Sequence, residues 1–438
     1  MLERRKTVNI RKIALDMLLD YEIQGKYVNL SLSSHTADSL TSSERGQLTA
    51  LLYTAVEHKL TYDYYIASLS GRNISDVDIY TRNLLRLGLC QIMDMISIPD
   101  FAATNETVKL ARNKGEAAFV NGVLRAAVRN KDNMPIPSRE KNLKRYLSVK
   151  YSFPLWMVKH FSALYGDEGC EELLRFYNNE KYTDITVNKA KTDVQALSEA
   201  LSAEPTLDNG LSLRLHGSVN PERLAGFSEG KFFVQDTASA TAVKALDPKS
   251  GDRVIDVCAC PGGKSFAAAS LMGGRGEIFA FDLHESKLSL ISEGAARLGF
   301  SNIKIAERDA TAPDESLFAT ADKVICDAPC SGLGVLSKKP DLRYKEEESI
   351  RDLPALQLKI LTESAKYLKR GGELLYSTCT LNPSENEDVV SEFLRENSDF
   401  KAVDFEVGSL SSKDGMLTLV PYIHKTDGFF MAKLKKET

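Results

Sequence analysis

Two cysteines, about fifty residues apart in this chain, each lie in a short segment typical of a reactive residue. Cys330 follows Asp327 in the segment KVICDAPCSGLG, and Cys379 lies in the segment GGELLYSTCTLNPSENE. In each segment an apolar, strand-like run ends shortly before the cysteine. A thiolate is a strong nucleophile, whereas a free cysteine in a core is only a small apolar side chain. Burial in a core would explain either cysteine alone. A catalytic role is indicated only if the fold brings the two thiols together.

The composition is that of an ordinary globular protein. The 438 residues suffice for two or three domains, and 43% are hydrophobic and 26% charged. No apolar run approaches the roughly 18 residues that span a bilayer. The N-terminus lacks the apolar core of a secretory signal and carries acids, so we expect a cytoplasmic protein without membrane contact.

The cysteines also bear on redox state and metals. There are seven, thinly spread and odd in number, which favours reduced thiols over a disulfide framework. Cys258 and Cys260 are separated by a single residue, and no second pair or nearby histidine completes a zinc set. The sequence therefore predicts no metal site.

Charge is distributed unevenly along the chain. Residues 1–150 hold 22 basic and 16 acidic residues, a net +6, while the remainder carries −10. The most basic part is 105–150, with 11 basic and 4 acidic residues. Such an excess indicates an anionic partner for the N-terminal part. A solvated helical surface is the alternative interpretation.

The first region of the chain, residues 1–135, is predicted to be helical throughout. Apolar residues recur there every three or four positions, as on one face of a helix. The clearest stretches are 10–21, 45–66, 80–95 and 117–129. The segment DNMPIPSRE, which begins near Lys131 and holds two prolines, indicates a linker.

Two further regions follow. Residues 140–230 mix helical stretches with short strand candidates, which predicts a small α+β domain that binds RNA or links its neighbours. From 231 to 438 short apolar runs alternate with helical stretches, the pattern of a Rossmann-like, doubly wound α/β domain with a parallel sheet. The last run, GFFMAKLKK, is predicted to be an edge strand.

Acidic residues end the successive strands of this third region. The series is Asp256, Asp282, Asp309 and Asp327. Ligands of such sheets bind beyond the carboxyl ends of the strands, and an acid 26 residues after the first, such as Asp282, can accept hydrogen bonds from a ribose diol. Such a series suits a cationic cofactor with a ribose and an adenine. It therefore predicts S-adenosylmethionine, although single aspartates at these positions can also cap helices or turns.

The loop after the first strand, CACPGGKS, excludes two common nucleotide sites. It lacks the G-x-G-x-x-G of dinucleotide-binding folds and the G-x-x-x-x-G-K-[ST] spacing of the P-loop. Gly262 and Gly263 nevertheless allow the backbone to turn sharply and approach a ligand closely.

Two thiols beside S-adenosylmethionine fit methylation at carbon 5 of a pyrimidine. That carbon is a weak nucleophile, and a thiolate that adds to carbon 6 activates it. A base must then remove the carbon-5 proton before the thiol can leave. One cysteine would attack and the other would assist release, while Asp327 is placed to act near ring nitrogen 3.

Three segments resemble the cofactor and catalytic motifs of RNA (cytosine-5) methyltransferases: DVCACPGGKS, DAPCSGLGV and YSTCTLNPSENE. The resemblance covers about residues 231–438. It implies that Cys379 is the nucleophile and that Cys330 acts in product release. DNA cytosine-5 methyltransferases attack from the Pro-Cys cysteine instead, so the pair favours RNA as substrate. One departure is Cys260, where the family usually has alanine.

The same resemblance implies the cofactor contacts. Asp282 would meet the ribose, Asp309 the adenine side, and Asp327 both cofactor and base. The loop after the first strand would meet the methionine end, through Cys258, Ala259, Cys260, Pro261, Gly262, Gly263 and Lys264. The basic residues of SKKPDLRY, which are Lys338, Lys339 and Arg343, would meet RNA phosphates or belong to a solvated loop.

The N-terminal region resembles a second family. Residues 103–129 are similar to the C-terminal helices of NusB-like RNA-binding domains. Fusion of such a domain to this catalytic domain is typical of the Sun, or RsmB-type, small-subunit ribosomal RNA methyltransferases. The resemblance implies 16S rRNA as partner and cytosine 967 as the target of the family. We expect an unpaired cytosine in a hairpin loop, because the base must leave its stack.

Alternatives remain open at this point. The same chemistry could act on tRNA or 23S rRNA, or the protein could be a NusB-like RNA-binding assembly factor with secondary catalysis. An amino-directed methyltransferase is less favoured, because Asp-Ala-Pro-Cys replaces the Pro-Pro-aromatic turn that such enzymes use.

Overall fold

The computed structural model describes residues 8–25, 40–179, 182–217 and 219–437. By their contacts these residues form two units. The first comprises Met1–Asn178 with Lys338–Lys345, and the second Asn179–Ser337 with Glu346–Thr438. The first unit is helical, and the second is a Rossmann-like α/β unit with a small additional sheet, which confirms the predicted fold class. Among the described residues, no helix is long and apolar enough to cross a membrane.

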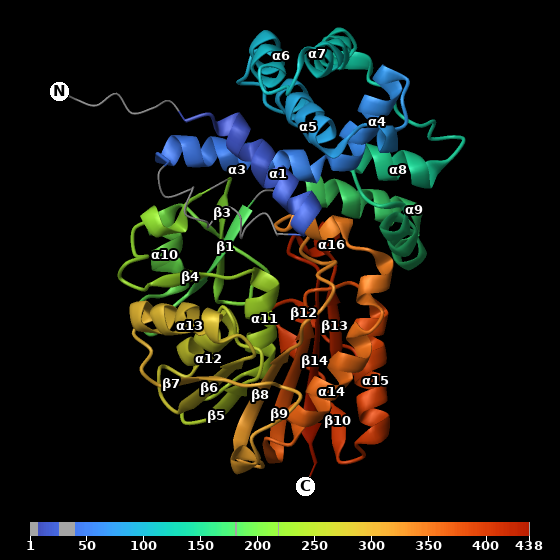
Figure 1. Ribbon diagram of the computed structural model, residues 1–438. Helices are drawn as coiled ribbons and strands as arrows, with labels where there is room; N and C mark the ends of the chain where they lie inside the picture. Colours follow the sequence, from blue (N-terminus) through green and yellow to red (C-terminus); the bar gives the residue numbers. More distant parts are fainter. Residues whose placement is uncertain (1–7, 26–39, 180–181, 218, 438) are drawn as a thin grey trace, which may run out of the picture. The chain divides into compact units, whose positions relative to one another are not determined.

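The first unit is built from eight described helices, labelled in Figure 1. They are α1 (Ile10–Gln24), α3 (Ser42–Glu57), α4 (Lys59–Ser70), α5 (Ile79–Met93), α6 (Asp100–Val108), α7 (Lys114–Arg129), α8 (Leu143–Tyr151) and α9 (Leu155–Asn179). The apolar faces of α1 and of α3 to α7 share one buried cluster, with α5 buried along most of its length. The helix predicted over 45–66 is wrong as a single element. The backbone leaves helical geometry at His58, with φ −102° and ψ 18°, so two helices form.

The segment Lys338–Lys345 belongs to the helical unit although it follows the Cys330 turn in the chain. Arg343 is completely buried there, and its guanidinium donates to Asn178 Oδ1 (2.7 Å), Tyr177 O (3.2 Å) and Glu57 O (3.3 Å). The expectation that Arg343 meets RNA phosphates or solvent is therefore wrong. The protein supplies the acceptors that RNA or water would otherwise provide, and burial of the charge requires them.

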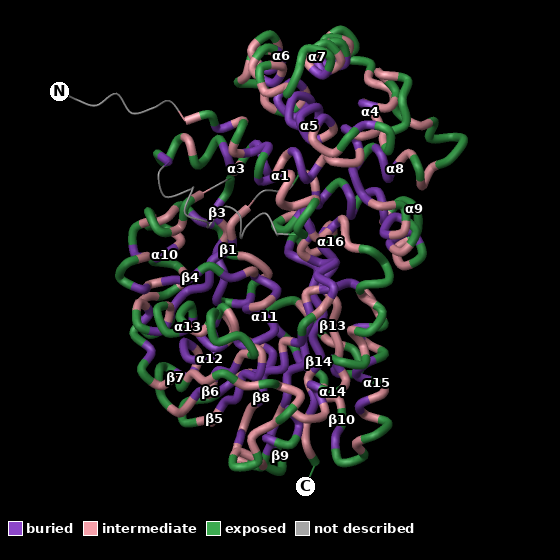
Figure 2. Tube along the Cα trace, in the orientation of Figure 1, coloured by how far each residue is buried: buried purple, intermediate pink, exposed green. Residues whose placement is uncertain are grey.

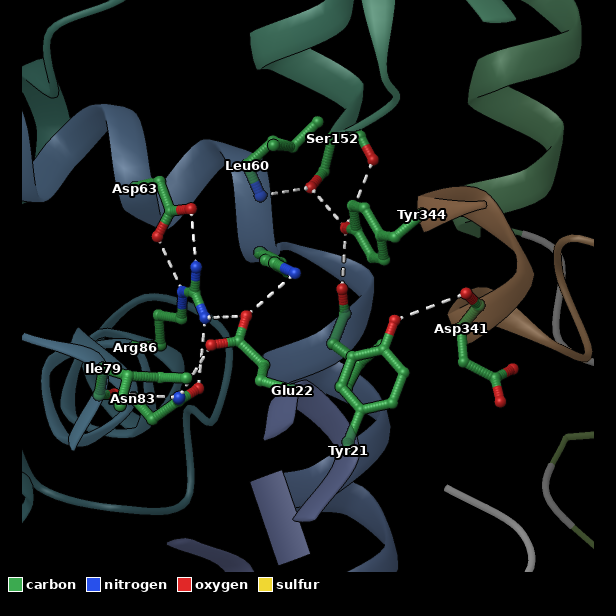
Figure 3. Close-up of polar contacts among 12 residues, drawn as sticks. Tyr21, Glu22, Leu60, Asp63, Ile79, Asn83, Arg86, Ser152, Asp341 and Tyr344 are labelled. Atoms are coloured by element: carbon green, nitrogen blue, oxygen red, sulfur yellow. Dashed lines mark hydrogen bonds and ion pairs between the residues drawn. The ribbon is translucent and has the colours of Figure 1, made fainter. Parts of the chain in front are cut away.

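Figure 3 shows how the rest of this segment is held. The Tyr344 hydroxyl donates to Val56 O (2.7 Å), and the Tyr21 hydroxyl donates to Asp341 O (3.4 Å). Beside them, Glu22 binds Arg86 (2.6 Å) and Lys59 (2.8 Å). Burial alone would raise the pKa of Glu22, but the two cations lower it to about 2. The segment thus lies against a charged network whose members neutralise one another.

The second unit contains a small antiparallel sheet in the order β2-β3-β1-β4. Its elements are β1 (Tyr182–Val187), α10 (Val194–Leu201), β2 (Glu204–Pro205), β3 (Ser212–His216) and β4 (Phe232–Val234). Asp184 is buried and fixes this sheet to the next helix: it binds Arg214 through two bonds (2.8 and 2.9 Å) and accepts from the Thr237 hydroxyl (2.7 Å).

The large sheet has the order β10-β14-β9-β8-β5-β6-β7, with β13 also paired to β14. Strands β5 (Arg253–Asp256), β6 (Glu277–Asp282), β7 (Ile303–Glu307), β8 (Ala321–Asp327) and β9 (Leu368–Thr378) are parallel. Strand β14 (Phe429–Lys436) is antiparallel to β9. It was predicted to be an edge strand, which is wrong, because β10 (Phe400–Ala402) and β13 (Met416–Leu419) pair with it. Those strands are too short to give a periodic signal.

Helices cover both faces of the large sheet. Alternate residues of a strand point to opposite faces, so Ile325 packs with α11 (Thr237–Leu246), α12 (Gly263–Leu271) and α13 (Glu285–Leu298). Its neighbour Val324 packs with α14 (Leu353–Ala365) and α15 (Glu387–Glu396). Figure 2 shows the resulting buried strands between more exposed helices. The remaining elements are β11 (Glu406–Val407), β12 (Leu410–Ser411) and α16 (Pro421–His424).

The Asp184–Arg214 pair gives a prediction for stability. Asp184→Ala leaves a largely buried guanidinium without its carboxylate, so we expect a loss of about 3–5 kcal/mol in the free energy of unfolding. Glu277→Ala is the control, because its pairs with Arg253 and Lys304 are over a third exposed and each is worth less than about 1 kcal/mol. Urea unfolding of both variants measures the difference, and equal losses would contradict the assignment.

Candidate active site

The carboxyl ends of the parallel strands bring the predicted site residues to one edge of the sheet. Asp256, Asp282 and Asp327 are the last residues of β5, β6 and β8. In the register between β8 and β9, Asp327 pairs with Ser377, one residue before Thr378 ends the strand. Asp309 lies two residues beyond the end of β7. The strand-end pattern predicted from the sequence is therefore present in the fold.

The two cysteines meet at this edge. Cys330 Sγ and Cys379 Sγ are 3.3 Å apart, a hydrogen-bond contact between free thiols that is longer than a disulfide bond of about 2.05 Å. The hydrogen bond with Cys379 and burial raise the pKa of Cys330 well above its usual value. Cys330 consequently stays protonated at neutral pH, as a thiol next to its partner.

The turn after Cys330 is fixed to the strand end that carries Cys379. The Gly334 N–H donates to Cys379 O (2.9 Å), and the Gly428 N–H donates to Gly334 O (2.8 Å). A Cβ atom at Gly334 would lie 1.9 Å from Gly428 O, so only glycine fits this crossing. Backbone bonds, and not only side-chain packing, thus set the separation of the two thiols.

Asp327 lies between a cation and a hydroxyl. Its carboxylate accepts from Lys264 Nζ (2.7 Å) and from Ser377 Oγ (2.8 Å). The Lys264 ammonium also lies 5.2 Å from the centre of the Phe429 ring. Lys264 comes from the first turn of α12, so this bond connects the loop after β5 with the acid beside the cysteines.

A buried acid next to the Cys330 turn was not predicted from the sequence. Glu385 is fully buried and accepts from the Ser331 N–H (2.8 Å), Gln357 Nε2 (2.9 Å) and Asn382 Nδ2 (3.1 Å). Gln357 also donates to Pro329 O (2.9 Å), so the residues on both sides of Cys330 are held. The segment NPSENE was recognised as part of a motif, but nothing in its spacing distinguishes a buried glutamate from a surface one.

The loop after β5 has an unusual backbone. The Cys260–Pro261 peptide bond is cis, and Gly262 has φ +110°. A Cβ atom at Gly262 would lie 2.5 Å from the Phe266 ring, so the position requires glycine. The Cys260 N–H donates to Asp282 Oδ2 (3.1 Å) and the His284 N–H to Asp282 Oδ1 (3.2 Å), which orients this carboxylate at the end of β6.

The other thiols of this region are not activated. Burial and neighbouring carboxylates raise the pKa of Cys258 well above its usual value, and burial and Asp282 raise the pKa of Cys260 to about 12. Cys260, the departure from the family pattern, therefore remains a thiol at neutral pH.

Asp309 caps a turn, as the alternative interpretation of the strand-end aspartates predicts. Its carboxylate accepts from the N–H and the hydroxyl of Thr311, each at 2.8 Å, and these bonds lower its pKa. The side chain is exposed. A contact with adenine remains a proposal for this residue.

The residues present fit S-adenosylmethionine. Asp256 is completely buried, yet its Oδ1 atom has no hydrogen-bond partner, while Oδ2 accepts from Ser265 (2.7 Å). A Cβ atom at Gly262 would lie 2.5 Å from the Phe266 ring, so the loop after β5 keeps bare backbone there, and the oriented carboxylate of Asp282 retains lone pairs for a diol. A Rossmann-like sheet with this set of groups defines a class, the S-adenosylmethionine-dependent methyltransferases.

Comparisons with known proteins identify the family. Residues 243–435 match the model of the 16S rRNA methyltransferase RsmB/F family, and residues 8–129 match the NusB family. The chain is 36% identical to the probable ribosomal RNA small subunit methyltransferase B of Bacillus subtilis, over 99% of this chain and 100% of that protein. It is 35% identical to the Synechocystis protein of the same description, over 98% and 100%.

A solved structure agrees over the whole length. The crystal structure titled PH0851 is 26% identical, covers 99% of this chain and 100% of its own, and superposes with a TM-score of 0.79. The chain belongs to the ribosomal RNA small subunit methyltransferase B family and is an S-adenosylmethionine-dependent rRNA methyltransferase with an N-terminal NusB domain.

The unpartnered Asp256 oxygen leads to a prediction about pH. Burial raises the pKa of Asp256 from 3.8 to about 7, so the folded protein holds a proton that the unfolded chain releases near pH 4. Its contribution to stability is present below pH 4 and is lost as the pH rises to about 7. At about 1.4 kcal/mol for each pH unit between the two pKa values, the loss is at most about 4 kcal/mol.

Asp256→Asn removes this titration while it keeps the shape of the side chain. We expect wild type to lose stability relative to Asp256→Asn between pH 4 and pH 7 in urea unfolding experiments. Parallel stability profiles for the two proteins would contradict the raised pKa of Asp256.

Proposed function

We propose that this enzyme methylates carbon 5 of one unpaired cytosine in a hairpin loop of 16S rRNA, cytosine 967 in the numbering of the family, through a covalent bond to Cys379. The observation that carries the proposal is the 3.3 Å contact between Cys330 and Cys379 beside Asp327. The NusB domain and the similarity to the small-subunit enzymes over the full length support 16S rRNA as the substrate.

The cofactor would be held by residues at three strand ends, those of β5, β6 and β7. The loop from Cys258 to Lys264 would hold its methionine end, Asp282 would accept from the ribose hydroxyls, and Asp309 would lie on the adenine side. S-adenosylmethionine supplies the electrophilic methyl group that carbon 5 takes up. These contacts are proposals, supported for Asp282 by the two backbone N–H groups that orient its carboxylate.

The two cysteines have different roles in this proposal. The Cys379 thiolate forms a bond to carbon 6 of the cytosine, and carbon 5 becomes nucleophilic. Asp327, bonded to the Lys264 ammonium, would lie near ring nitrogen 3, which takes a proton from this pair as the attack displaces electrons and returns it when the ring is restored. After methylation a base takes the proton from carbon 5, and its electron pair reforms the double bond as the carbon–sulfur bond breaks.

The surroundings of Cys330 support its later action. The hydrogen bond with Cys379 and burial raise its pKa, which suits a group that acts as a hydrogen-bond donor. A thiol at 3.3 Å can donate a hydrogen bond to the neighbouring sulfur, which favours the thiolate of Cys379 both before attack and after release. We therefore assign Cys330 to release of the product.

The two assignments predict opposite phenotypes. Cys379→Ala removes the attacking sulfur, so neither methylated RNA nor a covalent complex should form. Cys330→Ala still attacks and methylates, but release slows and a protein–RNA complex should accumulate on a denaturing gel with labelled RNA. The control is Cys170→Ala, which removes a thiol of the helical unit and should leave turnover unchanged. An accumulated complex from Cys379→Ala alone would reverse the assignment.

The substrate is tested separately. Bisulfite sequencing of ribosomal and transfer RNA from cells that lack the gene should show the loss of one protected cytosine, located in 16S rRNA. Loss of protection in tRNA or 23S rRNA instead would contradict the proposed specificity while leaving the chemistry intact.

A further inference from the structure

The helical unit carries a small basic cavity on the surface of α6 and α7, which lie side by side in Figure 1. The cavity has a volume of about 410 Å³, within the range of small-ligand sites. It is lined by Asp100, Phe101, Thr104, Asn105, Arg125, Val128 and Arg129. None of these residues belongs to the methyltransferase unit or to the site of the two cysteines.

The aromatic side chain of this cavity is exposed. Phe101 is 71% exposed, and it is the one phenylalanine among the large apolar side chains exposed in the described part of the chain. It lies in the first turn of α6, where its neighbour Ala103 is completely buried. Phe101 therefore contributes little to the core, and its ring is available to a partner.

The cations of the cavity are available as well. Arg125 and Arg129 are exposed, lie one helical turn apart on α7, and form no ion pair or hydrogen bond with another described residue through their side chains. The acid of the cavity, Asp100, is already paired with Lys131 at 2.9 Å. The cavity therefore keeps an uncompensated positive charge of about two.

We propose that this cavity binds one unpaired nucleotide of the RNA substrate, with the base against Phe101 and the flanking phosphates on Arg125 and Arg129. Bases that have left a helix are recognised by stacking on aromatic side chains, and phosphates by arginine. The exposed amide of Asn105 lies on the same wall and can pair with a base edge. This proposal rests on the proposed function in one respect: the RNA that binds here is the rRNA that the enzyme methylates.

RNA fits this cavity better than a protein partner does. The residues 105–150 hold 11 basic and 4 acidic residues, so the surroundings attract a polyanion. A protein partner would bury Phe101 without a requirement for two arginines, and its binding would depend little on salt.

The test is RNA affinity of the full-length protein, measured by fluorescence anisotropy with 16S rRNA and with a labelled single-stranded RNA dodecamer. Arg125→Ala and Arg129→Ala should each weaken binding several-fold and lower the slope of log K against log salt by about 0.7, the value for one phosphate of a single strand. Phe101→Leu should weaken binding about 5-fold or more with the slope unchanged, since it removes stacking and no charge.

The matched control is Arg145→Ala, which removes an exposed arginine of α8 in the same basic region. It should leave affinity within about 2-fold of wild type. Calorimetric S-adenosylmethionine binding of every variant should equal that of wild type. These measurements need no turnover, so they stand whether or not the RNA becomes methylated.

Two results would overturn the site. Affinities and salt slopes like those of wild type in the Phe101, Arg125 and Arg129 variants would show that RNA does not use the cavity. An equal loss in Arg145→Ala would show that the arginines act only through overall charge. Absence of methylation with the expected affinity changes would instead contradict the proposed function and leave the nucleotide site in place.

Discussion

The parallel pairing of β8 with β9 is the constraint on which the active site depends. Its register sets Asp327 opposite Ser377, and the chain that leaves each strand then carries one cysteine. The bonds of Gly334 to Cys379 O and to Gly428 close the turn over the end of β9. A shift of one residue in this register would turn Asp327 and its neighbours to the opposite faces of the sheet and separate the two sulfur atoms.

Local electrostatics makes the chemically similar cysteines differ from one another. Seven cysteines are present, and the two in the loop after β5, Cys258 and Cys260, are kept protonated by burial and by adjacent carboxylates. The hydrogen bond with Cys379 and burial raise the pKa of Cys330, and in the proposed mechanism Cys379 is the attacking sulfur with this thiol donor beside it. The Lys264–Asp327 ion pair spans the space between the first strand and the cysteines, and it gives the acid a fixed orientation.

The sequence predicted positions correctly where a residue pattern allows only one physical interpretation. Glycines with forced backbone geometry, strand-end acids and the two cysteine motifs all lie where the alternation of strands and helices placed them. It was a poor guide to burial of charge: Arg343 looked like a phosphate contact and is fully buried, and Glu385 holds the Cys330 turn without any sign in its spacing. Short strands gave no periodic signal, so β14 was mistaken for an edge.

In the helical unit, too, the sequence did not show which charged side chains are paired. The basic excess of residues 105–150 was visible in the sequence, but not which arginines are free to bind a partner. Arg112 and Arg139 belong to that excess and are bound to Glu116 and Glu171. Arg125 and Arg129 are not paired with a described residue, and only the packing of α6 on α7 sets them around Phe101.

The central claim, that Cys379 is the attacking sulfur, is tested most directly by mapping the covalent bond in the wild-type enzyme. RNA with 5-fluorocytosine at the target cannot lose the substituent at carbon 5 and should trap the complex. Trypsin separates the candidates, since Cys330 lies in the peptide 324–338 and Cys379 in the peptide 371–395. Mass spectrometry should find the nucleotide on peptide 371–395, whereas a nucleotide on peptide 324–338 would contradict the account.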